Sequence, residues 1–193
     1  MTGSSSVPIS LPALTLVLGG ARSGKSLLAE GLVRGTGRPR VYIATAQAQD
    51  DEMRAKIAQH RAGRGQDWQT LEEPRDLAPV LAAVRADKVV LLDCATLWLS
   101  NHLLAGADLA AESIGLLAAL MTCAAPVVVV SNEIGWSVVP ENALAREFRD
   151  AQGRLNQALA AQAGLVVAVM AGLPLLLKGA LPGLKGARPA DTA

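Results

Sequence analysis

The segment Gly19–Ser26, with the sequence GGARSGKS, constrains this chain more than any other part of it. It matches the pattern G-x-x-x-x-G-K-[ST], follows an apolar run that begins at Leu14, and precedes a stretch of helical spacing. Glycines here let backbone N–H groups turn toward phosphate oxygens, and the following helix adds its positive N-terminal end. Lys25 would bridge the β- and γ-phosphates of a nucleotide, and the Ser26 hydroxyl would bind magnesium. We therefore predict a phosphate-binding loop, since a glycine-rich turn without a ligand explains the pattern less well.

Apolar runs alternate with stretches of helical periodicity along the chain. The predicted strands are 14–20, 40–46, 68–74, 88–95, 126–133, 164–172 and 173–179, and the predicted helices are 25–33, 50–60, 76–86, 110–122 and 143–163. Most of these strands are apolar without alternation, which is typical of strands buried on both faces. We therefore predict an α/β fold with three layers, in which helices cover both faces of a mostly parallel sheet. The length favours one phosphate-loop nucleotide-binding domain, 1–193, with residues 1–13 and about 180–193 flexible.

The composition excludes several classes of protein. The chain has 18 basic and 17 acidic residues, so a broad surface for nucleic acid is not expected. Cys94 and Cys123 are far apart without metal-ligand spacing, which favours reduced thiols in a cytoplasmic protein. The N-terminus lacks the pattern of a signal peptide. Pro126 divides the apolar stretch 114–130, so we predict no membrane span.

An acidic residue, Asp93, ends the apolar run VVLLD. In phosphate-loop proteins an acid at the tip of a neighbouring strand often serves the magnesium ion, although a strand-end acid can also cap the next turn. The sequence contains no N-K-x-D guanine-reading motif and no G-x-G-x-x-G, and its D-x-x-G at 150–153 falls in a predicted helix. These absences disfavour a regulatory GTPase and a dinucleotide-binding protein. A small-molecule phosphotransferase remains.

One of the two histidines, His60, lies in the segment KIAQHRAGR. An ordinary helix end with Gly63 as the helix stop is one interpretation. The other is nucleophilic chemistry, because an imidazole is largely neutral at pH 7 and can form covalent intermediates. Attack on the α-phosphorus of a nucleoside triphosphate would give a nucleotidyl-histidine and release pyrophosphate. Arg61 and Arg64 could neutralise the developing phosphate charge.

Several motifs occur together in a fixed order. They are GGARSGKS, YIATA, DDEMRAKIAQHRAGR, the W-x-T-x-E of Trp68–Glu72, LLDCATLWLSN and SNEIGWSVVPENALAREFRDAQGRLNQALA. In this order they resemble the bifunctional adenosylcobinamide kinase / adenosylcobinamide-phosphate guanylyltransferase family, from about Leu14 to Lys178. The phosphate loop is generic, whereas the histidine segment and the last block are specific.

The resemblance implies two reactions in vitamin B12 biosynthesis. A nucleoside triphosphate (ATP or GTP) phosphorylates adenosylcobinamide. GMP then passes from GTP, through a guanylyl-histidine, to adenosylcobinamide phosphate, giving adenosyl-GDP-cobinamide. The family motif I-x-x-H-[RK] places the nucleophile at His60, whereas His102 matches no such motif and is expected to be structural. The resemblance also implies a RecA-type phosphate-loop fold and a homo-oligomer, a trimer.

The resemblance further implies the residues of the site. His60 and Lys25 would be catalytic, and Ser26 would bind Mg²⁺. The implied nucleotide contacts are Gly19, Gly20, Ala21, Arg22, Ser23, Gly24, Lys25, Ser26, Ala44, Thr45, Ala46, Arg61, Ala62, Gly63, Arg64, Glu72 and Asp93. Glu72 or Asp93 could contact the guanine base, because a carboxylate can accept two hydrogen bonds from the Watson–Crick edge of guanine. Apart from the resemblance, Asn132 and Glu133 end a predicted strand, where ligand sites of α/β folds collect, and Arg146 and Arg149 follow on a predicted helix. They are candidate substrate contacts outside the predicted site, and ordinary salt bridges on a helix face are the alternative for the arginines.

Two alternatives stay open at this point. A single-activity small-molecule kinase would transfer a phosphoryl group and carry no GMP on His60. A non-catalytic nucleotide-binding partner or switch would bind without turnover. The order of the motifs favours the bifunctional enzyme over the first alternative. The histidine segment and the missing guanine-reading motif disfavour the second.

Overall fold

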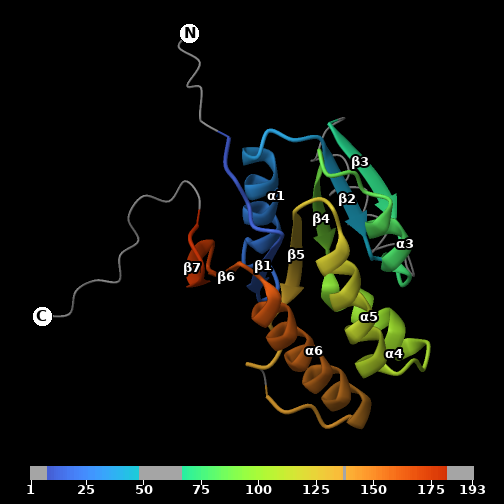
Figure 1. Ribbon diagram of the computed structural model, residues 1–193. Helices are drawn as coiled ribbons and strands as arrows, with labels where there is room; N and C mark the ends of the chain where they lie inside the picture. The colour runs from blue at the N-terminus through green and yellow to red at the C-terminus, as the bar shows by residue number, and fades with distance from the viewer. Residues whose placement is uncertain (1–7, 48–66, 137, 182–193) are drawn as a thin grey trace, which may run out of the picture.

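The computed structural model describes residues 8–47, 67–136 and 138–181, and its centre is a seven-stranded sheet (Figure 1). The strand order across the sheet is β3-β2-β4-β5-β1-β6-β7. The strands are β1 (Leu14–Gly19), β2 (Arg40–Ala44), β3 (Trp68–Glu72), β4 (Val89–Asp93), β5 (Val127–Asn132), β6 (Leu165–Met170) and β7 (Leu173–Lys178). Each of them overlaps a strand predicted from the apolar runs.

The first six strands of the sheet are parallel and the last is antiparallel. β1 pairs in parallel with β5 and β6, β2 pairs in parallel with β3 and β4, and β4 pairs in parallel with β5. β7 runs antiparallel to β6 at the edge of the sheet, where Pro174 is tolerated because an edge strand leaves some N–H positions unpaired. The predicted mostly parallel sheet is confirmed.

Helices cover both faces of the sheet and make three layers (Figure 1). α1 (Lys25–Gly35) packs on one face, and the other face is covered by α3 (Leu77–Ala82), α4 (Ala95–Leu104), α5 (Leu109–Thr122) and α6 (Ala143–Gln162). Neighbouring residues of β1 pack into the two hydrophobic cores on opposite faces of the sheet. Leu16 faces the α3–α6 side and Val17 faces α1. Neither side chain has any exposed surface. Burial on both faces explains why the strands are apolar without alternation.

Two helices differ from the prediction. No helix was expected at 95–104, where α4 forms, because its sequence ATLWLSNHLL has no continuous polar face. Six of its ten residues are buried, so packing on more than one side replaces the usual amphipathic pattern. The helix predicted for 76–86 is the shorter α3. The helix predicted for 50–60 lies outside the described residues.

The part of the expected leader that the structure describes is packed against α1. Leu11 is buried, and the backbone N–H of Ile9 donates a hydrogen bond to the carbonyl oxygen of Gly35 at 2.9 Å. The Ile9 side chain lies against Gly35, where an added Cβ would meet its Cδ1 at 2.9 Å. Residues 8–13 therefore help to close the α1 side of the molecule. Among the described residues, no helix combines the length and apolar character needed to cross a membrane.

Candidate nucleotide site

The predicted phosphate loop connects β1 to α1. Gly24 caps α1 with a left-handed backbone, φ +95°. A Cβ at Gly24 would also lie 3.3 Å from the Cα of Gly172, in the β6–β7 turn. The N–H of Gly172 donates a hydrogen bond to the carbonyl oxygen of Ser23 at 2.9 Å. The β6–β7 turn therefore packs directly against the phosphate loop. Position 24 needs a glycine for two reasons: its backbone is left-handed, and the Cα of Gly172 leaves little room for a Cβ.

Lys25 is the first residue of α1, and its ammonium group turns back over the loop. Its Nζ donates a hydrogen bond to the carbonyl oxygen of Gly20 at 3.1 Å. Ser26 follows in the same first turn, which contains no acidic residue. The positive end of the helix dipole and the lysine charge therefore act together at the loop, an arrangement that favours bound phosphate.

Three predicted residues stand side by side at the carboxyl edge of the sheet. Ala44 at the end of β2 is in register with Glu72 at the end of β3 and with Asp93 at the end of β4. β5 alone separates β4 from β1, the strand that leads into the phosphate loop. Ligand sites of parallel α/β sheets lie outside these carboxyl ends. The register therefore creates a row of candidate contacts that leads to the loop.

Asp93 is held in place by a neighbouring strand. The hydroxyl of Tyr42 donates a hydrogen bond to Oδ2 of Asp93 at 3.2 Å. Burial, and then the negative charge of Asp93, raise the pKa of the Cys94 thiol to about 11, whereas the positive charge of Lys25 acts in the opposite direction. Asp93 and Lys25 thus both act electrostatically on the same buried thiol. A carboxylate and a cationic phosphate-loop lysine therefore both lie near Cys94, and a site for a nucleotide and its metal uses groups of these two kinds.

The structure brings together most of the predicted site residues. The loop Gly19–Ser26, the segment Ala44–Ala46, Glu72 and Asp93 all lie at the carboxyl edge of the sheet. Glu72 is an exposed residue at the end of β3 and falls within the strand predicted for 68–74. The segment His60–Arg64 lies outside the described residues, so the structure does not place the histidine relative to this edge.

The two arginines proposed as possible substrate contacts have local partners. Arg146 donates hydrogen bonds through Nη1 to the carbonyl oxygens of Pro140 and Glu141. Arg149 pairs with Asp150, with 2.9 Å between Nη2 and Oδ1. Arg146 therefore holds the chain that enters α6, and the contacts of both arginines are structural ones within or next to this helix.

A cavity of about 360 Å³ lies beside the phosphate loop. Its walls come from β1, β6, β7 and the segment after β5: Leu18, Gly19, Gly20, Glu133, Ile134, Trp136, Ala168, Val169, Met170 and Leu177. The N–H of Glu133 donates to the carbonyl oxygen of Gly19 at 3.1 Å, which fixes this segment against the loop. The walls are mostly apolar, with one carboxylate, a composition that suits the non-phosphate part of an organic substrate.

Two residues that support the site could not be singled out from sequence. Gly172 resembles any glycine after a strand, and its role is visible only once the β6–β7 turn is placed behind the loop. Asn101 lies in the helix that was not predicted, and its side chain donates a hydrogen bond to the carbonyl oxygen of Thr45 at 2.8 Å. No local pattern carries either contact, because both join segments that are distant in the sequence.

Comparison with known proteins decides the family. Residues 15–177 match the cobinamide kinase / cobinamide phosphate guanyltransferase family. The chain belongs to this family. The bifunctional adenosylcobalamin biosynthesis protein CobP of Pseudomonas aeruginosa is 48% identical over 167 residues, which cover 85% of this chain and 96% of the relative. CobU of Escherichia coli, described in the same words, is 43% identical over 86% of this chain and 99% of its own. CobU of Salmonella typhimurium is 44% identical over the same shares.

Among solved structures, the RadB recombinase aligns with this member of the cobinamide kinase family at a TM-score of 0.47. That alignment has 18% identity and covers 82% of this chain and 74% of the recombinase chain. The flagellar accessory protein FlaH from Methanocaldococcus jannaschii aligns at a TM-score of 0.45 with 13% identity, over 89% of this chain and 80% of the FlaH chain.

Proposed function

We propose that this chain phosphorylates adenosylcobinamide and then converts the phosphate to adenosyl-GDP-cobinamide, with His60 as the carrier of GMP. The observation that carries the proposal is the carboxyl edge of the sheet, where Glu72, Ala44 and Asp93 stand in register and β5 alone separates their strands from the strand of the phosphate loop. Family membership supplies the two substrates. The phosphate loop and the acidic edge supply groups that can hold a nucleotide at both of its ends.

In the first step, the substrate hydroxyl oxygen attacks the γ-phosphorus of a nucleoside triphosphate. The bond between the γ-phosphorus and the β–γ bridging oxygen breaks, the hydroxyl loses its proton, and a nucleoside diphosphate leaves. Lys25 and the loop N–H groups stabilise the charge on the transferred group and on the leaving diphosphate. The cavity beside Gly19 and Gly20 gives the acceptor a path to the same phosphates.

In the second reaction, a ring nitrogen of His60 attacks the α-phosphorus of GTP. The α-phosphorus bond to the bridging oxygen breaks, and pyrophosphate leaves. A phosphate oxygen of adenosylcobinamide phosphate then attacks the same phosphorus, the P–N bond breaks, and free histidine returns. Arg61 and Arg64 would balance the charge at the α-phosphate, while Glu72 would accept hydrogen bonds from guanine.

Magnesium fits the residues at this edge. The Ser26 hydroxyl and the Asp93 carboxylate are hard oxygen ligands of the kind that Mg²⁺ prefers, and it commonly keeps water and nucleotide phosphate as its other ligands. Bound there with the nucleotide, the ion would neutralise phosphate charge. Ser26 lies in the first turn of α1 and Tyr42 holds Asp93, so both oxygens come from fixed elements.

We further propose that the chain works as a homo-oligomer in the cytoplasm, a trimer by its resemblance to the family. Exposed leucines on β7 support an association between subunits. Leu175 and Leu176 point to opposite faces of this edge strand, yet their exposed fractions are 54% and 44%. A contiguous apolar edge of this kind usually serves as a contact surface.

The test is intact-protein mass spectrometry after incubation with GTP and Mg²⁺, with wild type, His60→Ala and Lys25→Ala compared. We expect a mass increase equal to one GMP moiety in wild type and none in His60→Ala. The His60→Ala protein should still phosphorylate adenosylcobinamide, whereas Lys25→Ala should lose most of both activities. A GMP adduct on His60→Ala would exclude this histidine as the nucleophile. The absence of an adduct in wild type that binds GTP would favour a single-activity kinase.

A further inference from the structure

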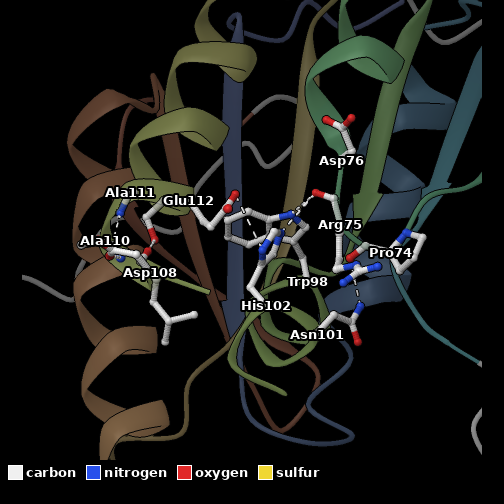
Figure 2. A network of polar contacts seen from close by, with 12 residues as sticks. Pro74, Arg75, Asp76, Trp98, Asn101, His102, Asp108, Ala110, Ala111 and Glu112 are labelled. Atoms are coloured by element: carbon white, nitrogen blue, oxygen red, sulfur yellow. Dashed lines mark hydrogen bonds and ion pairs between the residues drawn. The ribbon is translucent and has the colours of Figure 1, made fainter. Parts of the chain in front are cut away.

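Side chains of α4 form hydrogen bonds with the backbone of the segment that follows β3 (Figure 2). Trp98 donates a hydrogen bond through Nε1 to the carbonyl oxygen of Arg75 at 2.8 Å, and Nε2 of His102 lies 3.3 Å from the same oxygen. Asn101, from the same helix, donates through Nδ2 to the carbonyl oxygen of Pro74 at 3.0 Å. Two consecutive carbonyl groups just beyond Glu72 are therefore fixed by buried side chains of α4.

Asn101 makes a second contact with the same nitrogen. Nδ2 also donates to the carbonyl oxygen of Thr45 at 2.8 Å, immediately after β2. Thr45 is joined in turn to β4: its Oγ1 donates to the carbonyl oxygen of Cys94 at 2.8 Å, and its N–H donates to that of Asp93 at 3.3 Å. A single amide group therefore links the ends of β2 and β3, and Thr45 extends this link to β4.

The linked strand ends carry the row of proposed nucleotide contacts. Glu72 lies two residues before Pro74, and Ala44 and Ala46 flank Thr45. We infer that Asn101 is a positioning residue for guanine recognition. β3 already pairs with β2 at Glu72, and the two hydrogen bonds of Asn101 hold the segment just after Glu72 against the residue that follows β2. The inference rests on the proposed function, which gives Glu72 the contact with guanine.

The chemistry explains why asparagine is suited to this position. Its amide nitrogen carries two hydrogens, and each faces one of the two carbonyl oxygens. Aspartate would present oxygen to both carbonyls, and serine could donate only one hydrogen bond. Asn101 has an exposed fraction of 9%, so water does not readily replace a lost bond.

The experiment measures the dissociation constants of GDP and IDP with Mg²⁺ by isothermal titration calorimetry. These diphosphates avoid turnover by phosphoryl or pyrophosphate loss, and IDP lacks the exocyclic amino group of guanine. Wild type should bind GDP about tenfold more tightly than IDP, the effect of one hydrogen bond to a carboxylate. Asn101→Ala should bring this ratio close to one while the affinity for IDP changes little. Glu72→Gln should also lower the ratio, and the double variant should lower it no further.

Asn156→Ala is the matched control. Asn156 is a buried asparagine whose Nδ2 donates to the carbonyl oxygen of Asn132 at 3.1 Å, at the end of β5. Its loss should lower the melting temperature and leave the GDP-to-IDP ratio at the wild-type value. If Asn101→Ala does not fold, Asn101→Ser is measured by the same criterion, with an intermediate ratio expected.

Two other outcomes distinguish a failure of the Asn101 inference from a failure of the proposed contact between Glu72 and guanine. An unchanged ratio in Glu72→Gln would show that the assigned guanine contact is wrong, and the inference about Asn101 would fall with it. A lowered ratio in Glu72→Gln, together with equal losses for both diphosphates in the Asn101 variant, would leave the contact standing. Asn101 would then be only a structural residue, and the inference would be overturned.

Discussion

The hydroxyl of Tyr42 lies 3.2 Å from Oδ2 of Asp93, so a buried tyrosine on β2 orients the acid at the tip of β4. The substitution Tyr42→Phe removes this hydrogen bond and keeps the aromatic ring. A hydrogen bond to a charged group contributes about 1.5–3 kcal/mol. If Asp93 serves the nucleotide or its metal, Tyr42→Phe should weaken Mg²⁺-dependent GDP binding by about tenfold, as measured by calorimetry. Equal affinities in the two proteins would argue against a role for this orientation.

The two glycines that open the phosphate loop should respond differently to alanine. A Cβ at Gly19 would lie 2.4 Å from Ser23 Oγ and 2.7 Å from the carbonyl oxygen of Val169, whereas a Cβ at Gly20 has no neighbour within 4 Å. Since the Val169 backbone is fixed in β6, Gly19→Ala should lower the free energy of unfolding by about 1–3 kcal/mol. Gly20→Ala should change it by less than about 0.5 kcal/mol. Urea unfolding of both variants without nucleotide makes the comparison, and similar losses would contradict the clash.

The strands and the phosphate loop were predictable because their signals are local. A strand buried on both faces has to be apolar throughout, as Leu16 and Val17 illustrate by facing opposite cores. The order G-x-x-x-x-G-K-[ST] between a strand and a helix likewise needs no distant partner. The bounds of the predicted strands therefore agree with the structure within a few residues.

The rest of the site depends on contacts that no local pattern carries. Glu72 and Asp93 come together only because β2 lies between β3 and β4, and strand order is a property of the whole sheet. Asn101 donates a hydrogen bond to Thr45, which is 56 residues away in the sequence. It does so from α4, a helix that the hydrophobic periodicity did not indicate. The family resemblance implied Glu72 and Asp93, but it did not point to Asn101 as their support.

Exposed leucines on β7 should hold subunits together if the proposed homo-oligomer forms. Leu173 and Leu175 have exposed fractions of 72% and 54%, so Leu173→Asp and Leu175→Asp should reduce the molar mass measured by light scattering after size exclusion. Leu104 at the end of α4 is a matched control with an exposed fraction of 64%. Leu104→Asp should leave the mass unchanged. An unaltered oligomer in both β7 variants would show that this edge is not the contact.

Cys94 should make the protein less stable at alkaline pH. The thiol has an ordinary pKa of 9.0 in the unfolded chain and about 11 in the folded protein, mainly because it is buried. Above pH 9 the unfolded chain loses this proton while the folded protein keeps it, so the free energy of unfolding falls as the pH rises toward 11. The loss should be on the order of 2 kcal/mol.

Cys94→Ser isolates this effect. The thiol accepts a hydrogen bond from the N–H of Leu97 at the start of α4, and the serine hydroxyl can accept the same bond without titrating in this range. Urea unfolding at about pH 8 and about pH 10.5 should show a smaller alkaline loss for Cys94→Ser than for wild type. Cys123→Ser is the control, because the Cys123 thiol is only half-buried and burial raises its pKa without the added charge of a neighbouring aspartate. If Cys94→Ser and wild type lose stability equally between the two pH values, then other groups dominate the alkaline transition.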